Sequence, residues 1–129
     1  MPGMHVIFVL DESGSMGGSP WKSLMDAYQA FLKKRMGDQG GEGDMVSIVL
    51  FHSTARIVGP IIQPIEAAPN YINPLLQGTC FQPAMLEAEK CLAVTPSNKS
   101  PVVLFMSDGG SGDSAGVSYI LHLNDFELY

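Results

Sequence analysis

The chain has 129 residues, which is room for one domain of ordinary size. Hydrophobic residues make up 46% and charged residues 16%, a composition that excludes disordered and fibrous proteins. Thirteen acidic residues against seven basic ones give a formal net charge of −6. This balance disfavours nucleic acid as a partner, because a phosphate backbone needs a basic protein surface.

Neither a membrane span nor a secretory leader is recognisable. No apolar run approaches the roughly 20 residues that cross a bilayer, and no Lys or Arg precedes the short apolar run that begins at Val6. Cys80 and Cys91 are too few for a disulfide framework, and a helix between them would hold them too far apart to form a bridge. We therefore expect a cytoplasmic protein with reduced thiols.

The amino-terminal third predicts a strand followed by a helix. Residues 5–10 form a continuous apolar run, which is typical of a strand buried on both faces. Ser19 followed by Pro20 is a helix-start signal, and Gly37 is suited to end the helix. Apolar residues recur between them at helical spacing and predict one buried stripe: Trp21, Leu24, Met25, Tyr28, Phe31 and Leu32.

The remaining elements alternate in the same way. Further apolar runs predict strands at 45–51 and 102–106, and a short strand at 55–58 is expected to pair back on the former. Residues 61–77 are rich in proline and are expected to be irregular, with short helical turns. A second helix is predicted from about Pro83 to Ala93, with Met85, Ala88 and Leu92 facing inward.

This element order predicts an α/β fold, with a doubly wound, mostly parallel sheet and helices on both faces. In such folds ligands bind beyond the carboxyl ends of the strands, where the strand order reverses. Short oxygen donors follow the predicted strands at these ends: Asp11, Ser13 and Ser15 after the first, and Asp108 after the strand at 102–106. Thr79 precedes the second helix in a Gly-Thr context.

Together these residues resemble the metal-ion-dependent adhesion site of von Willebrand factor type A (vWA) domains. The family pattern D-x-S-x-S, a distant Thr and an Asp-Gly pair is filled here by Asp11, Ser13, Ser15, Thr79 and Asp108. The resemblance implies a Rossmann-like fold and a site for Mg²⁺, with Mn²⁺ or Ca²⁺ possible, because such ions favour oxygen ligands. It further implies a non-enzymatic module that captures an Asp or Glu of a protein partner through the ion.

Three other residues of the site region have weaker expectations. Glu12 is expected to point away from the metal, toward solvent or a neighbouring loop. His5 and His52 are expected to be strand-end residues, since the histidines show no metal-ligand spacing.

Two alternative functions remain open. The chain could be a regulatory or scaffolding part of a larger intracellular enzyme assembly. More remotely, Gly112-Asp-Ser114-Ala-Gly116 fits the G-x-S-x-G pattern of serine hydrolases, although an elbow of that kind should follow its strand directly.

The carboxy-terminal part departs from the family. We assign residues 1–129 to a single vWA-like domain, with the resemblance covering about residues 4–115 and an atypical tail at 116–129. Alternation from Val117 to Leu123 predicts one strand where the family has several more elements. We therefore expect the strand after Pro101 to lie at an open sheet edge, with one face of the sheet short of a covering helix. A fragment, a mis-predicted reading frame and a compacted variant all remain open.

Overall fold

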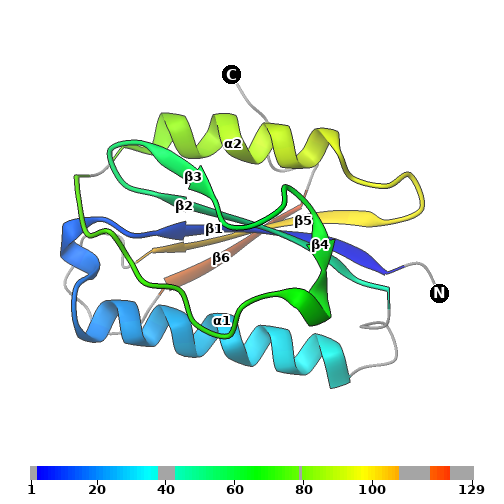
Figure 1. The fold of residues 1–129 in the computed structure, drawn as a ribbon, viewed down its shortest axis with the longest axis horizontal. Coiled ribbons are helices and arrows are strands. Elements are labelled where there is room, and N and C mark those ends of the chain that lie inside the picture. The colour runs from blue at the N-terminus through cyan, green and yellow to red at the C-terminus, as the bar shows by residue number, and fades with distance from the viewer. Residues whose placement is uncertain (1–2, 38–42, 79, 108–116, 123–129) are drawn as a thin grey trace.

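The computed structural model describes residues 3–37, 43–78, 80–107 and 117–122. One strand precedes the first helix and three strands separate it from the second, as Figure 1 shows. Their bounds in chain order are β1 (Met4–Asp11), the 3-10 turn η1 (Gly14–Met16), α1 (Ser19–Gly37), β2 (Met45–Phe51), β3 (Ala55–Ile57), β4 (Gln63–Pro64), the 3-10 turn η3 (Ile65–Ala67), α2 (Phe81–Ala93), β5 (Ser100–Ser107) and β6 (Val117–His122).

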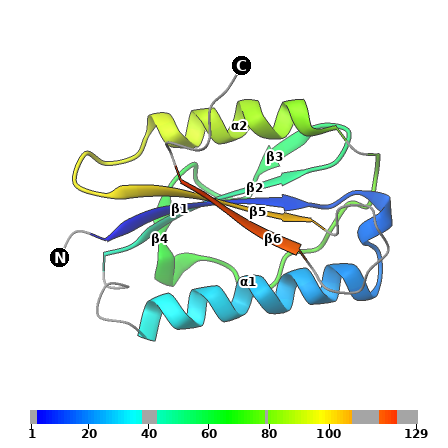
Figure 2. The same cartoon turned by 180° about the vertical axis from the view of Figure 1, so that it is seen from behind.

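The strands form one sheet in the order β3-β2-β1-β5-β6, with β4 pairing on β2. The central strand β1 runs parallel to β2 and β5, whereas β3, β4 and β6 are antiparallel to their neighbours. Helix α1 covers one face of the sheet and α2 the other (Figures 1 and 2). The predicted α/β architecture, with a mostly parallel centre and helices on both faces, is confirmed.

Burial on both faces explains why the central strands are apolar without alternation. Residues 6–10 of β1 are completely buried. Phe8 packs with the α1 stripe, in edge-to-face contact with Tyr28 at 4.9 Å between ring centroids, whereas Ile7 and Val9 pack with α2. The three parallel strands β1, β2 and β5 each supply apolar side chains to two separate cores, because successive side chains of a strand point to opposite faces.

Helix α1 has the predicted bounds, but α2 begins at Phe81, two residues before the predicted start at Pro83. The early start is compatible with Pro83, because N–H groups in the first helical turn have no intrahelical partner to lose. The most buried residues of α2 are Ala84, Ala88 and Cys91. Met85 and Leu92, which were predicted to face inward, are only partly buried against the same core.

The cysteines are both free, as predicted, with Cys80 exposed and Cys91 buried. Burial raises the pKa of the Cys91 thiol, so this side chain is a core filler and a poor nucleophile.

The expectation of an open sheet edge beside β5 is wrong. β6 pairs with β5 along its whole length, from Val102 opposite His122 to Ser107 opposite Val117. The alternating segment thus forms the one strand predicted for it and supplies the hydrogen-bond partners that β5 would otherwise lack. The expectation that one face lacks a helix is also wrong, since α1 and α2 lie on opposite faces (Figure 2).

His5 is a buried polar residue within β1, near the amino-terminal ends of the parallel strands. Its Nε2 lies 2.7 Å from the Ser47 Oγ, and its Nδ1 lies 2.6 Å from the Thr95 Oγ1. The Ser47 hydroxyl donates its proton to the Ile61 carbonyl oxygen, so it must accept from Nε2–H. In the neutral ring Nδ1 then accepts from the Thr95 hydroxyl, so both ring nitrogens have a partner.

Folding stability is expected to fall as His5 becomes protonated. Burial lowers the pKa of His5 from 6.5 to about 4 in the folded protein. The unfolded chain therefore binds more protons between these values, and lowering the pH from about 7.5 to 5 should cost about 2 kcal/mol through this group. Urea unfolding at both pH values should show a smaller loss for His5→Gln than for the parent. An equal loss in both proteins would show that His5 does not titrate as its burial implies.

Candidate metal centre

The candidate site begins where β1 ends, at the centre of the sheet. The chain places β2 on one side of β1 and β5 on the other, so the strand order reverses at β1. In this class of fold that reversal leaves a crevice at the carboxyl ends of the strands. Asp11 is the last residue of β1, and its side chain is nearly buried at this position.

The loop after β1 brings two of the predicted ligands together. Asp11 Oδ1 accepts a hydrogen bond from the Ser13 backbone N–H at 2.9 Å, and the Ser13 and Ser15 hydroxyl oxygens are 3.3 Å apart. Ser13 is 1% exposed, whereas Ser15, in the short turn η1, is exposed. The loop therefore presents a buried and an accessible hydroxyl beside a carboxylate.

The distance between the two hydroxyls fits two ligands of one small cation. Neighbouring oxygens of an octahedron are about 3.0 Å apart for Mg²⁺, whose ligand distance is about 2.1 Å, and about 3.4 Å apart for a Ca²⁺ distance of about 2.4 Å. The observed 3.3 Å lies between these values. Carboxylate and hydroxyl oxygens are also the donor types that such hard cations prefer.

A second segment, residues 75–78, lies against this loop. Gly14 N–H donates to the Gln77 carbonyl oxygen at 2.6 Å, and Ser13 pairs with Gln77 in a parallel bridge. The Cys80 N–H donates to the His52 carbonyl oxygen at 2.7 Å. The structure thus brings together the loop after β1, the turn between β2 and β3 and the segment before α2, at the left of Figure 1.

The other predicted ligands, Thr79 and Asp108, lie outside the described residues, as does Ser114 of the alternative hydrolase motif. β5 ends at Ser107, immediately before Asp108, and Met106 pairs with Leu10. Within the described part of the chain, no group of three or more His, Cys, Asp or Glu side chains is arranged to hold a metal. Among the described residues, the candidate site offers the Asp11 carboxylate and the hydroxyls of Ser13 and Ser15.

Of the two alternatives expected for Glu12, solvent or a neighbouring loop, the structure shows the second. The Glu12 side chain is fully buried. Arg56 donates to both of its carboxylate oxygens, at 3.1 Å from Nε and 2.8 Å from Nη2. The Leu75 N–H donates to Oε1 at 3.0 Å, and the His52 Nδ1 lies 2.8 Å from Oε2. We call these four residues the Glu12 network.

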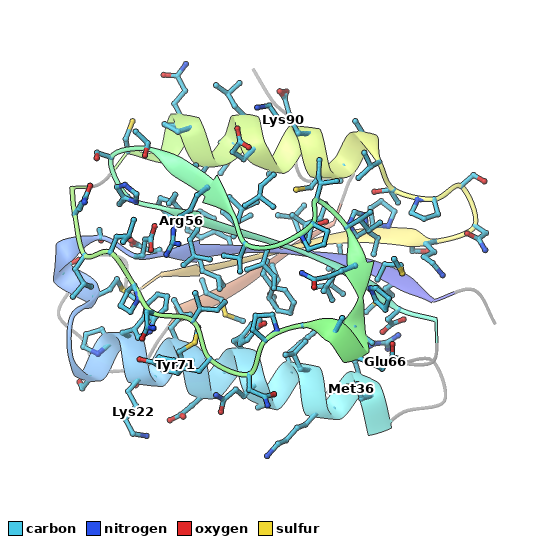
Figure 3. The ribbon with its side chains drawn as sticks, in the orientation of Figure 1. Lys22, Met36, Arg56, Glu66, Tyr71 and Lys90 are labelled. Atoms are coloured by element: carbon cyan, nitrogen blue, oxygen red, sulfur yellow. The ribbon has the colours of Figure 1, made fainter. Side chains whose placement is uncertain are left out.

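The Glu12 network holds a charged carboxylate in the interior. Burial alone raises the pKa of Glu12, but the hydrogen bonds from Arg56, the Leu75 backbone and His52 outweigh it, and this pKa lies below its ordinary value. Figure 3 shows Arg56 reaching from β3 into the molecule, whereas Lys22 and Lys90 extend away from it. The pairing with Glu12 in turn raises the pKa of Arg56.

Sequence reasoning missed the Glu12 network, although it expected His52 near a strand end. One signal was available, since Arg56 is a single charge within the predicted short strand at 55–58. A charged side chain in such a position needs a buried partner of opposite charge, because an unpaired charge is costly to remove from water. Its partner Glu12 lies 44 residues away, and spacing along the chain could not identify it.

Two exposed leucines lie beside the loop after β1. Leu75 is 49% exposed and Leu76 is 42% exposed. Leu76 has a left-handed backbone with φ of 58°, which is rare for a residue with a Cβ. Its side chain lies beside Gly17 of the loop after β1, so the rim of the site is partly apolar.

Comparison with solved structures shows similarity to a pilus protein. The vWF domain of the type V pili tip protein Mfa5 from Porphyromonas gingivalis matches at 24% identity and a TM-score of 0.61, over 84% of this chain and 38% of that one. A structure of three N-terminal domains of Mfa5 matches at 24% identity and a TM-score of 0.58, over 84% of this chain and 20% of that one. The chain thus spans well under half of these proteins, and the likeness shows the fold alone.

Another solved structure matches more of the chain but less closely. An aerotolerance-related membrane protein from Bacteroides fragilis, carrying multiple mutations to serines, matches at 16% identity and a TM-score of 0.47, over 95% of this chain and 83% of that one. A search of curated proteins gave no match. In the described part of this chain, neither helix is long and apolar enough to cross a membrane.

The family model of the von Willebrand factor type A domain matches residues 6–111. This range includes the central parallel strands, both helices and the loop that carries Ser13 and Ser15. The chain therefore belongs to the von Willebrand factor type A domain family.

Proposed function

We propose that this domain binds a partner protein through a divalent cation, Mg²⁺ by preference, held by Asp11, Ser13, Ser15, Thr79 and Asp108. Domains of this family are generally protein-interaction modules. The observation that carries the proposal is the pair of hydroxyls 3.3 Å apart beside Asp11, at the point where the strand order reverses.

The donor set favours an acidic ligand from the partner. Asp11 and Asp108 provide only two formal negative charges, so a dication held there would keep an excess of positive charge. When bound, the ion supplies an electrophilic centre with a free position for an outside carboxylate. No nucleophile or general base is required, and the proposed role is binding without catalysis.

The surroundings of the site support a macromolecular partner. Leu75 and Leu76 expose large apolar side chains beside the loop. Exposed apolar side chains bordered by polar residues are a feature of protein-interaction surfaces. We propose that an Asp or Glu of the partner marks the centre of the interface.

Metal binding is expected to raise the melting temperature of the parent. At a Mg²⁺ concentration about 100 times its Kd, the gain in free energy of unfolding is about 2.7 kcal/mol relative to chelator. For a domain of this size this gain raises the melting temperature by about 10 °C. Asp11→Ala should abolish this gain, whereas Asp26→Ala, on the exposed side of α1, should retain it. Equal melting temperatures of the parent with Mg²⁺ and with chelator would count against the proposal.

The partner chemistry needs a separate measurement. A random peptide display library, selected on the domain with Mg²⁺, should become enriched in sequences with an Asp or Glu. Their binding should disappear with chelator and after the acid is replaced by its amide. Selected peptides that bind equally well in chelator would contradict an ion-mediated contact.

A second proposal places the domain within a larger protein as a regulatory or scaffolding part. The supporting observation is that the chain spans only 38% and 20% of the two Mfa5 chains. Detection of the native protein with an antibody against this domain should then show a band well above 13.9 kDa. A band at the mass of the domain would contradict this proposal and leave the binding proposal intact.

A further inference from the structure

We infer that Glu12 is a positioning residue for the candidate metal site, acting through its buried contacts with Arg56, His52 and the Leu75 backbone. The inference rests on the proposed function, because it assigns a role toward the proposed ion. It goes further in naming residues that bind no metal themselves but determine whether the site can do so.

Glu12 sets the backbone between two proposed ligands. Glu12 lies between Asp11 and Ser13, and its N–H donates to the Phe51 carbonyl oxygen at 2.8 Å, which continues the pairing of β1 with β2. Successive side chains of extended backbone point to opposite sides. Anchoring the Glu12 side chain on one side therefore holds Asp11 and Ser13 on the other.

Glu12 also holds the neighbouring segment in place. Glu12 Oε1 accepts from the Leu75 N–H, and two residues later the Gln77 carbonyl oxygen accepts from the Gly14 N–H. The Arg56 Nη2 also donates to the Asn73 carbonyl oxygen at 3.1 Å. One carboxylate thus holds the segment at 73–77 against the loop that carries both serine hydroxyls.

The Glu12 side chain is fixed by its burial and its hydrogen bonds. Burying a carboxylate without partners strongly destabilises the folded state. Here each carboxylate oxygen of Glu12 has two hydrogen-bond partners. The side chain is therefore confined to one arrangement. Its donors occupy the carboxylate, so Glu12 is not itself available as a ligand of the ion.

A matched control lies at the opposite end of the sheet. Asp44 is also a fully buried carboxylate, and Arg35 donates to both of its oxygens at 2.7 and 3.1 Å. It joins α1 to the start of β2, and it accepts hydrogen bonds from Arg35 and from the Met4 N–H, at the opposite end of β1 from the loop. Loss of the ion pair at Asp44 is comparable to loss of the ion pair at Glu12. It should therefore lower the folding stability without changing the metal affinity of the candidate site.

The test compares Glu12→Gln with Asp44→Asn. Mn²⁺ is titrated by calorimetry as a probe of the site, and thermal unfolding in chelator reports stability without metal. Both variants should melt below the parent. The Kd for Mn²⁺ should rise about 10- to 100-fold in Glu12→Gln, a typical effect of residues that support metal ligands, and stay at the parent value in Asp44→Asn.

Arg56→Gln provides a second variant if Glu12→Gln does not fold. It removes the bidentate partner but leaves His52 and the Leu75 N–H on the carboxylate, so a smaller rise in Kd is expected. Parent-like Mn²⁺ affinity in every folded variant of Glu12 or Arg56 would overturn the positioning role alone. Absence of Mn²⁺ binding to the parent would overturn the proposed function and this inference with it.

Discussion

Phe8→Ala is expected to lower the free energy of unfolding by about 3–5 kcal/mol, the usual cost of removing a fully buried aromatic side chain. Phe8 is completely buried in the centre of β1. Its ring contacts Tyr28 and Phe31 edge to face, at centroid distances of 4.9 and 5.6 Å. These contacts join the central strand to α1, so the cavity would open where the sheet meets its covering helix.

Urea unfolding of Phe8→Ala at neutral pH measures this loss, with Leu86→Ala as the control. Leu86 is 51% exposed on α2, so its truncation removes little buried surface and should change stability by under about 0.5 kcal/mol. Similar losses in the two variants would contradict the burial that the structure assigns to Phe8.

Asp44→Ala is expected to cost about 3–5 kcal/mol, because removing one partner of a buried ion pair leaves the other charge uncompensated. Asp44 accepts hydrogen bonds from Arg35 and, at 2.8 Å, from the Met4 N–H. A Cβ added to Gly3 would collide with the Asp44 carboxylate, so the chain also approaches this side chain closely. The substitution would release α1, β1 and β2 from a shared anchor.

The control for Asp44→Ala is Asp26→Ala, which removes the same chemical group from an exposed pair. The Asp26 side chain is 62% exposed and lies 3.1 Å from the Lys22 Nζ. Such exposed pairs contribute about 0–1 kcal/mol. Chemical denaturation of both variants should therefore separate them by several kcal/mol, and equal losses would show that the burial of Asp44 has no energetic consequence.

The proposed site depends on contacts over very different distances along the chain. Asp11, Ser13 and Ser15 lie within five residues, so the loop that carries them could be predicted from local sequence. That the segment ending in Gln77 lies against this loop follows from tertiary pairing. The ligand roles of all five predicted residues stay predictions, and those of Thr79 and Asp108 concern residues outside the described part of the chain.

The sequence by itself determined the fold class, the positions of the main strands and helices, and the loop after β1. Hydrophobic periodicity, Pro20 at a helix start and the D-x-S-x-S spacing are local signals, and local signals can be recognised without knowing what lies nearby in space. The apolar run of β1 even indicated burial on both faces, which the two cores confirm.

Only the tertiary structure decided the partners of buried polar groups and of the sheet edges. The hydrogen bonds of Glu12 reach 40 to 63 residues along the chain, and those of His5 reach 42 and 90. The pairing of β6 on β5 likewise corrected the expected open edge. Apolar burial is non-directional and leaves a pattern in the sequence, whereas a buried charge needs one particular donor whose place is set by how the elements pack.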